Sequence, residues 1–236
     1  LQGCATVKTQ HAAPVAHQGL VSAADPRAAE AGAEMLRQGG SAVDAAIATM
    51  LALNVVEPQS SGIGGGGFML RGDAQGHVTS FDGRETAPTG ADPQWFLDAN
   101  GKPLPFMTAV ISGRSVGVPG NLRLAEEAHE RFGKLPWATL FGPAIKLARD
   151  GWLLSERGRE FLANAKNRAG HQPEGLALYY GADGQPLPAG AVLKNPALAE
   201  TLAQVAAHGA DWFYSGANAR AVAAEVAAET PRAGAM

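Results

Sequence analysis

The clearest repeat of hydrophobic positions lies near the start of the chain and predicts a helix that begins at Pro26. Small or apolar residues recur on one face of that helix, at Ala28, Ala31, Gly32 and Met35. Asp25 offers an oxygen to cap the helix, and the ring of Pro26 fixes a helical φ where no amide partner is needed. The pattern ends at Gly39 and Gly40.

A second helix is predicted from Ala42 to Val56, and it is apolar on nearly every side. Ser41 and Asp44 have the spacing of a short capping box at its start. A helix without a polar face is buried in a protein core or in a membrane, and this one is too short to cross a bilayer. We therefore expect a central core helix that stops before Pro58.

The rest of the pattern is mixed. Residues 68–71 and 77–82 predict the two strands of a β-hairpin, and short strands are also predicted at residues 19–23 and 108–112. Further helices are expected after Pro119-Gly120, from Pro143, after Asn195-Pro196 and over residues 217–229. Early strands followed by helices indicate an α+β fold in which helices pack on sheet.

Composition narrows the function classes. The 236 residues are 46% hydrophobic and 17% charged, which is enough apolar material for a sizeable core. A net charge of −3 disfavours nucleic acid as a partner. The single cysteine excludes a disulfide framework and a Cys-rich zinc module. Because the six histidines form no H-x-x-x-H or H-x-H pair, we expect no metal site.

The glycine run at residues 62–67 matches G-x-G-x-x-G, but its context is wrong for a nucleotide site. A dinucleotide fingerprint needs a strand before the glycines and a helix after them. Here a helix precedes the run and a strand follows it. We therefore expect no nucleotide cofactor, and we interpret the glycines as positions where a bare backbone passes close to something or adopts a positive φ.

Residues 113–117 match the G-x-S-x-G nucleophile elbow around Ser115, and Asp150 and His171 follow in the order of a catalytic triad. An elbow leads directly into a helix, whereas Pro119 forces Val118 toward an extended conformation. A serine hydrolase using Ser115 is therefore one hypothesis, with this feature against it.

Arg84 directly follows the second hairpin strand and precedes a loop that contains Pro88. An arginine held there can bind a substrate carboxylate through two parallel hydrogen bonds. A structural ion pair with Asp82, Glu85 or a distant acid would explain it equally well. The spacing alone does not separate the two interpretations.

The N-terminal tetrad Leu1-Gln2-Gly3-Cys4 is similar to the end of a bacterial lipoprotein signal, in which the cysteine carries the lipid. Residues 5–18 are polar and aperiodic, as a tether should be. We expect residues 1–18 to be a lipobox-like start with a flexible tether, and residues 19–236 to form the folded unit.

Taken together, the motifs resemble the γ-glutamyltransferase (γ-glutamyl transpeptidase) family. Five segments carry the resemblance in the family's order: residues 39–46 (GGSAVDAA), 64–69 (GGGGFM), 82–88 (DGRETAP), 118–120 (VPG) and 147–151 (LARDG). The resemblance covers about residues 19–236 and implies an N-terminal-nucleophile hydrolase with an αββα sandwich. This chain is similar to the front part of the large subunit, so we expect an incomplete sandwich.

The resemblance also implies a mechanism. Family members cut their own precursor, and the new N-terminal threonine of the small subunit attacks γ-glutamyl amides such as glutathione. It implies that the nucleophile lies outside this chain, that the small subunit is the partner, and that no cofactor is used. Arg84 matches the arginine that binds the γ-glutamyl α-carboxylate. With Cys4 lipidated, the protein would be periplasmic or membrane-anchored.

Two further functions fit the same sequence. A cephalosporin-acylase-like amidase has the same fold, and a non-catalytic binding or structural fragment belongs to another class. Only the residues that line the substrate pocket outside this chain would separate the amidase from a γ-glutamyltransferase.

Overall fold

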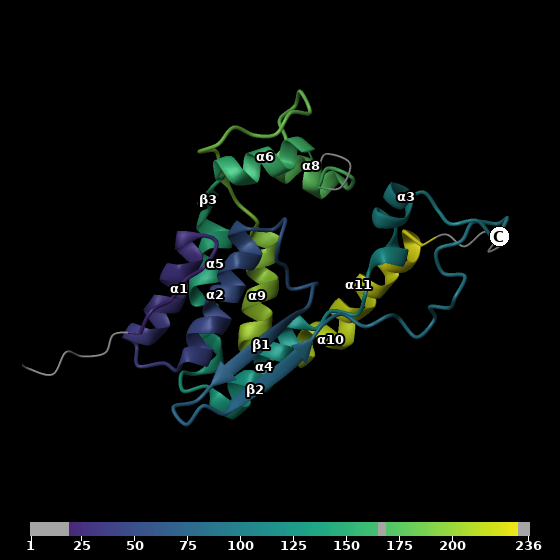
Figure 1. Ribbon diagram of the computed structural model, residues 1–236. Coiled ribbons are helices and arrows are strands. Elements are labelled where there is room, and N and C mark those ends of the chain that lie inside the picture. The colour runs from purple at the N-terminus through teal and green to yellow at the C-terminus, as the bar shows by residue number, and fades with distance from the viewer. Residues whose placement is uncertain (1–18, 165–168, 231–236) are drawn as a thin grey trace, which may run out of the picture.

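A computed structural model describes residues 19–164 and 169–230 of the chain, and helices make up most of it (Figure 1). Its longer helices, in chain order, are α1 Pro26–Arg37, α2 Ala42–Val56, α4 Asn121–Phe132, α5 Gly142–Asp150, α6 Glu156–Asn164, α8 Pro173–Tyr179, α9 Pro196–His208 and α11 Gly216–Ala228. Its short helices are α3 Phe106–Val110, η1 Gly113–Ser115, η2 Trp137–Phe141 and α10 Asp211–Tyr214. Its strands are β1 Gly67–Gly72, β2 Val78–Gly83, β3 Trp152–Leu153 and β4 Val192–Leu193.

Helix α2 is the centre of the core, as its apolar sequence predicts. Ile47, Leu51 and Val55 are all buried in it. Helices α1 and α5 pack against it, and α9 packs against α5, in a layer that Figure 1 shows from the side. The capping box is confirmed, because the Ser41 hydroxyl accepts from the Asp44 amide and the Asp44 carboxylate accepts from the Ser41 amide.

Asp44 also ties α2 to the chain that follows α4. Its carboxylate is fully buried, and Oδ2 accepts hydrogen bonds from the amides of Ser41 at 2.7 Å, Lys134 at 2.9 Å and Leu135 at 3.3 Å. A buried carboxylate needs such donors, because water cannot reach it. One side chain therefore fixes the start of the core helix against a segment ninety residues away.

The predicted hairpin is confirmed as β1 paired antiparallel with β2, from Gly67 opposite Gly83 to Gly72 opposite Val78. One face packs on α4, where Phe81 is buried and meets Phe132 edge to face at 6.2 Å between ring centroids. The other face exposes Phe68 and Leu70. The hairpin is thus a sheet with one covered and one uncovered side.

A small cap lies over one end of the helical layer. It consists of α6 and α8, and the short pair β3–β4 connects it to the layer (Figure 1). On the side of the helical layer away from α1, α10, α11 and α3 form an arm that extends away from the core (Figure 1), and η1 packs between α3 and α11. The Gly113 amide donates to the Glu229 carbonyl at 2.8 Å and thereby holds η1 against the end of α11.

Two strand predictions are wrong. Residues 19–23 have no strand partner in the described structure and are irregular. Residues 108–112, predicted as a strand, belong mainly to α3, in which the Ala109 amide bonds to the Pro105 carbonyl at 3.0 Å. In both cases a β-compatible sequence has no neighbouring strand edge to pair with, and backbone groups find partners locally instead.

The α+β class is confirmed. The predicted helices after Pro119-Gly120, from Pro143 and after Asn195-Pro196 form as α4, α5 and α9, and the helix predicted over residues 217–229 forms as α11. Helices α6 and α8 were not predicted. The expected tether and Cys4 lie outside the described residues. Within residues 19–164 and 169–230, no helix has the length and apolar character needed to cross a membrane.

Candidate functional site

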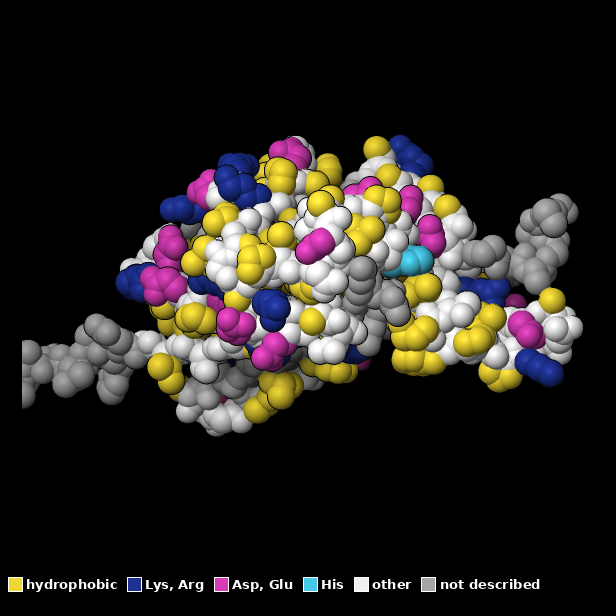
Figure 2. All heavy atoms as spheres, turned by 90° about the horizontal axis from the view of Figure 1, so that it is seen from above, with side chains coloured by type: hydrophobic (Ala, Val, Ile, Leu, Met, Phe, Trp, Pro, Cys, Tyr) yellow, Lys and Arg dark blue, Asp and Glu magenta, His cyan; other side chains and the backbone are white. Residues whose placement is uncertain are grey.

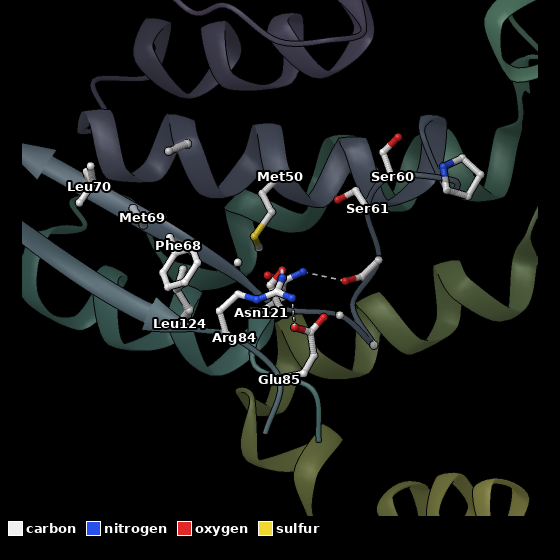
Figure 3. Close-up of a pocket in the computed structure, with 17 residues that line it drawn as sticks. Met50, Ser60, Ser61, Phe68, Met69, Leu70, Arg84, Glu85, Asn121 and Leu124 are labelled. Atoms are coloured by element: carbon white, nitrogen blue, oxygen red, sulfur yellow. Dashed lines mark hydrogen bonds and ion pairs between the residues drawn. The ribbon is translucent and has the colours of Figure 1, made fainter. Parts of the chain in front are cut away.

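A cavity of about 710 Å³ lies between α2, the glycine-rich segment before β1, and the start of α4 (Figure 3). Met50 of α2 borders it on one side, and Ser60 and Ser61 border it on another. Arg84 and Asn121 lie between these walls in Figure 3. Three separate parts of the sequence therefore converge on one space.

Three glycines make this convergence possible. A β-carbon on Gly66 would lie 2.4 Å from the Gly83 carbonyl oxygen, and one on Gly120 would lie 2.1 Å from the same atom. A β-carbon on Gly83 itself would lie 2.5 Å from Cβ of Leu124. Each distance is too short for any residue with a side chain. The expectation that the glycine run permits close backbone approach is thus confirmed at Gly66.

Arg84 leaves β2 where these backbones cross, and its side chain borders the cavity. Its Nη1 donates to the Gly66 carbonyl at 3.3 Å, and its Nη2 lies 3.0 Å from Glu85 Oε2. Asp82 does not form an ion pair with the guanidinium. Its Oδ1 instead accepts a hydrogen bond from the backbone N–H of Arg84. Just over half of the side chain (54%) is exposed.

The contacts of Arg84 are weak enough to leave its fork available. The bond to Gly66 is long for N–H···O, and Glu85 Oε2 makes no aligned hydrogen bond, so charge alone holds that pair. A guanidinium has five N–H donors, and these two contacts occupy a minority of them. The geometry therefore combines both interpretations of Arg84: an ion pair orients it, and free donors remain beside the cavity.

Asn121 is a site residue that sequence reasoning missed. It is the first residue of α4 and is 7% exposed, and its Nδ2 donates to the Gly62 carbonyl at 2.8 Å. The backbone N–H groups of Gly120 and Asn121 both donate to the Gly65 carbonyl. These bonds hold the glycine-rich segment against the start of α4. The sequence indicated a helix start after Pro119-Gly120, where Asn121 lies. No spacing pattern, however, connected Asn121 with Gly62.

The arrangement suits the binding of an anion. The guanidinium follows a strand end and borders a cavity, and it can donate two parallel hydrogen bonds to a planar carboxylate. Among the described residues, no group of three or more His, Cys, Asp or Glu side chains is placed to bind a metal ion. Strand β1, rather than a helix, follows the glycine run, so the run does not lead into a helix as a dinucleotide fingerprint requires.

The structure does not assemble the triad proposed around Ser115. Ser115 ends η1, and the element before it is α3 rather than the strand that an elbow requires. Its Oγ donates to the carbonyls of Val110 at 2.8 Å and Ser112 at 3.0 Å. No hydrogen bond in the described residues joins Ser115 to His171, or His171 to Asp150 at the end of α5.

Comparison with known proteins supplies an independent finding. The sequence profile described as "Gamma-glutamyltranspeptidase" matches residues 28–236. A relative from Bacillus subtilis (strain 168), named "Glutathione hydrolase proenzyme", is 41% identical over 203 residues, which are 86% of this chain and 34% of the relative. This chain therefore spans about a third of the length of that relative.

Solved structures give the same result for the fold. The crystal structure of Helicobacter pylori γ-glutamyltranspeptidase matches with a TM-score of 0.84 and 33% identity, over 91% of this chain and 61% of that one. The cephalosporin acylase from Bacillus halodurans matches with a TM-score of 0.76 and 27% identity, over 96% of this chain and 44% of that one. The prediction of an α+β chain that forms part of an N-terminal-nucleophile hydrolase fold is confirmed.

Proposed function

Since this chain belongs to the γ-glutamyltranspeptidase family, we propose that the protein it contributes to transfers or hydrolyses γ-glutamyl groups. The donors are glutathione and related γ-glutamyl amides. The nucleophile is a threonine outside these residues, exposed when the precursor cuts itself. The small subunit produced by that cut is the partner of this chain, and the reaction uses no cofactor.

The observation that carries the proposal is the position of Arg84. A γ-glutamyl donor has an α-carboxylate at one end and the reacting amide at the other. Arg84 borders a cavity of about 710 Å³ with much of its fork free. Arg84 is held there by the Gly66 carbonyl and Glu85. By binding the carboxylate end of the donor, it positions the amide end relative to the site.

The chemistry is acyl transfer in two steps. The threonine oxygen forms a bond to the γ-carbonyl carbon, and the C–N bond breaks as the departing amine takes up a proton. Water or an amine then attacks the ester and releases the threonine oxygen. The free α-amine of an N-terminal threonine can serve as the base in both steps. Arg84 takes part in neither bond change and acts through positioning.

The test uses two anilide donors with the full-length, self-cleaved protein. One is the γ-glutamyl anilide, and the other is the 4-aminobutanoyl anilide, in which hydrogen replaces the α-carboxylate. We expect strong preference for the first donor, and loss of that preference in Arg84→Ala. The 236-residue chain alone should turn over neither donor. If mature Arg84→Ala kept the preference, Arg84 would not bind the carboxylate.

A cephalosporin-acylase-like amidase is the second candidate, because the acylase from Bacillus halodurans matches 96% of this chain. The same pair of donors separates the two functions. An amidase of that type would accept acyl groups without the α-amino acid end, so a wild-type protein indifferent to the α-carboxylate would favour it.

We also propose that the protein is exported as a lipoprotein through Cys4, with residues 5–18 as the tether. This proposal rests on the Leu1-Gln2-Gly3-Cys4 tetrad alone.

A further inference from the structure

The side chain of Asn121 runs along the glycine-rich segment, residues 62–66, that precedes β1. Its Nδ2 donates to the Gly62 carbonyl at 2.8 Å. A β-carbon built on Gly65 would lie 3.7 Å from its Nδ2, and one on Gly67 would lie 3.3 Å from its Oδ1. Because Asn121 is only 7% exposed, its hydrogen bond lies in surroundings of low dielectric, where it is stronger than in water. One side-chain amide therefore meets the segment from its first residue to the start of β1.

The glycine-rich segment has little structure of its own. It is neither helix nor strand, and four of its five residues are glycines, which lose more conformational freedom on folding than other residues. The Gly65 N–H donates to the Gly62 carbonyl at 3.1 Å and closes a turn. Asn121 Nδ2 donates to that same carbonyl, so it braces the turn from outside. The conformation of the segment thus depends on the start of α4.

That conformation also sets the position of the carbonyl that holds Arg84. Arg84 Nη1 donates to the Gly66 carbonyl at 3.3 Å, and Asn121 approaches the residues on either side of Gly66 (Figure 3). The other contact of the guanidinium is its ion pair with Glu85. Two parallel bonds to a carboxylate require one orientation of the guanidinium plane. A shift of the Gly66 carbonyl would therefore turn the fork away from that orientation.

We propose that Asn121 is a positioning residue for recognition of the donor. Through the glycine-rich segment and the Gly66 carbonyl, it sets the direction in which Arg84 offers its fork to the α-carboxylate. This inference rests on the proposed function, because it takes Arg84 as the group that binds that carboxylate. Loss of the Asn121 side chain lowers selectivity for the carboxylate, while the backbone N–H of residue 121 still donates to the Gly65 carbonyl.

The test compares kcat/KM for the γ-glutamyl anilide and the 4-aminobutanoyl anilide in the self-cleaved, full-length protein. Asn121→Leu keeps a side chain of similar size and removes the hydrogen-bond donor. We expect kcat/KM for the γ-glutamyl anilide to fall about three- to tenfold, the range of one ordinary hydrogen bond, and that for the 4-aminobutanoyl anilide to change by less than about twofold. A merely structural role would lower both values equally, because it would reduce the amount of active protein.

Asn218→Leu is the matched control. Asn218 Nδ2 donates to the Phe213 carbonyl at 3.1 Å in the arm, so this variant removes the same kind of bond far along the chain from Arg84. It should leave the ratio of the two kcat/KM values unchanged. In Arg84→Ala, adding Asn121→Leu should not lower the ratio further, because Asn121 acts through Arg84. Thermal unfolding of each variant shows whether it is folded.

Three results would overturn the inference. The first is a wild-type preference for the γ-glutamyl donor that Asn121→Leu keeps in full. The second is an equal fall of the ratio when Asn121→Leu is added to wild type and to Arg84→Ala. The third is failure of both Asn121→Leu and the smaller Asn121→Ala to cleave themselves, which would assign Asn121 to folding. A wild type indifferent to the α-carboxylate would overturn the proposed function and this inference with it, whereas the first result overturns this inference alone.

Discussion

Asp44 shows how one residue can decide the stability of the core helix. Its buried Oδ2 accepts three backbone amides, whereas Oδ1 makes no hydrogen bond and lies 3.8 Å from His129 Nε2. In Asp44→Asn the charge is lost, and an amide nitrogen in either position lacks a good acceptor. We expect the free energy of unfolding to fall by about 2–3 kcal/mol, since hydrogen bonds to charged groups contribute about 1.5–3 kcal/mol each.

The matched control for this prediction is Ser41→Ala. It removes only the N-cap oxygen of α2 and should cost about 1 kcal/mol. Urea unfolding of the full-length protein measures both variants. A loss in Asp44→Asn no larger than that in Ser41→Ala would mean that the contacts to Lys134 and Leu135 contribute nothing.

Arg84→Lys tests whether the fork of the guanidinium matters or only its charge. Lysine keeps the positive charge but binds a carboxylate as a point charge, without two parallel bonds. We expect kcat/KM for the γ-glutamyl anilide to fall roughly ten- to a thousandfold, the equivalent of losing one charged hydrogen bond or more. Self-cleavage should be largely spared, because no donor is bound during that step. Equal kcat/KM in Arg84→Lys and wild type would show that charge alone is sufficient.

Among the elements, the crossing of the glycine-rich segment, β2 and the start of α4 places the candidate site. Gly120→Ala puts a β-carbon 2.1 Å from the Gly83 carbonyl, and backbone rather than a flexible side chain must move. We expect a loss of about 3 kcal/mol in unfolding free energy, typical of severe overpacking, and lower kcat/KM because Gly83 directly precedes Arg84.

Gly64→Ala is the control for that variant. A β-carbon at Gly64 meets nothing within 4 Å, so its stability should change by no more than about 0.5 kcal/mol. Chemical unfolding of both variants checks the pair. Similar losses in the two would mean that glycine is needed for chain flexibility and not for close approach.

Local signals predicted the elements whose partners lie close in the sequence. Asp25 and Ser41 cap α1 and α2 as their side chains suggest, and the β-hairpin closes on itself across a short turn. Residues 108–112 were misassigned because β-branched side chains favour a strand only where a neighbouring edge exists. Helix α8 was missed although Pro173 and Glu174 are typical of a helix start.

The candidate site was only partly predictable for the same physical reason. Arg84 was identifiable because a strand, an arginine and a proline-bearing loop are adjacent in sequence. Asn121 was not, since its partner Gly62 is fifty-nine residues away and no periodicity connects them. The resemblance to a family indicated the segments that meet at the site. The structure shows that bare glycine backbones are what allow them to meet.

For the whole molecule, one prediction concerns where it resides. If Cys4 carries a lipid, the full-length protein should fractionate with membranes in a bacterial host, and Cys4→Ser should be released to the soluble fraction. Because residues 1–18 are expected to be a tether, the thermal unfolding temperature of the two forms should be the same. Identical soluble behaviour of wild type and Cys4→Ser would reject lipidation.

The last prediction concerns the apolar surfaces of the chain. Phe68 and Leu70 are 70% and 72% exposed on the uncovered face of the hairpin, and Val78 of β2 is 68% exposed. The arm carries a second apolar region, a groove of about 920 Å³ along α11. Seen from above in Figure 2, hydrophobic side chains gather toward the arm, whereas charged side chains crowd the opposite end. Large apolar patches and open strand edges promote association.

We therefore expect the 236-residue chain to self-associate at micromolar concentration when studied alone. The double variant Phe68→Ser/Leu70→Ser should shift it toward the monomer in sedimentation velocity. It should cost little stability, because both side chains are already exposed. Leu153→Ser is the matched control: Leu153 is 56% exposed on β3, away from both surfaces, so this change should not alter the association. A sharp wild-type monomer with cooperative unfolding would show that these surfaces do not drive association.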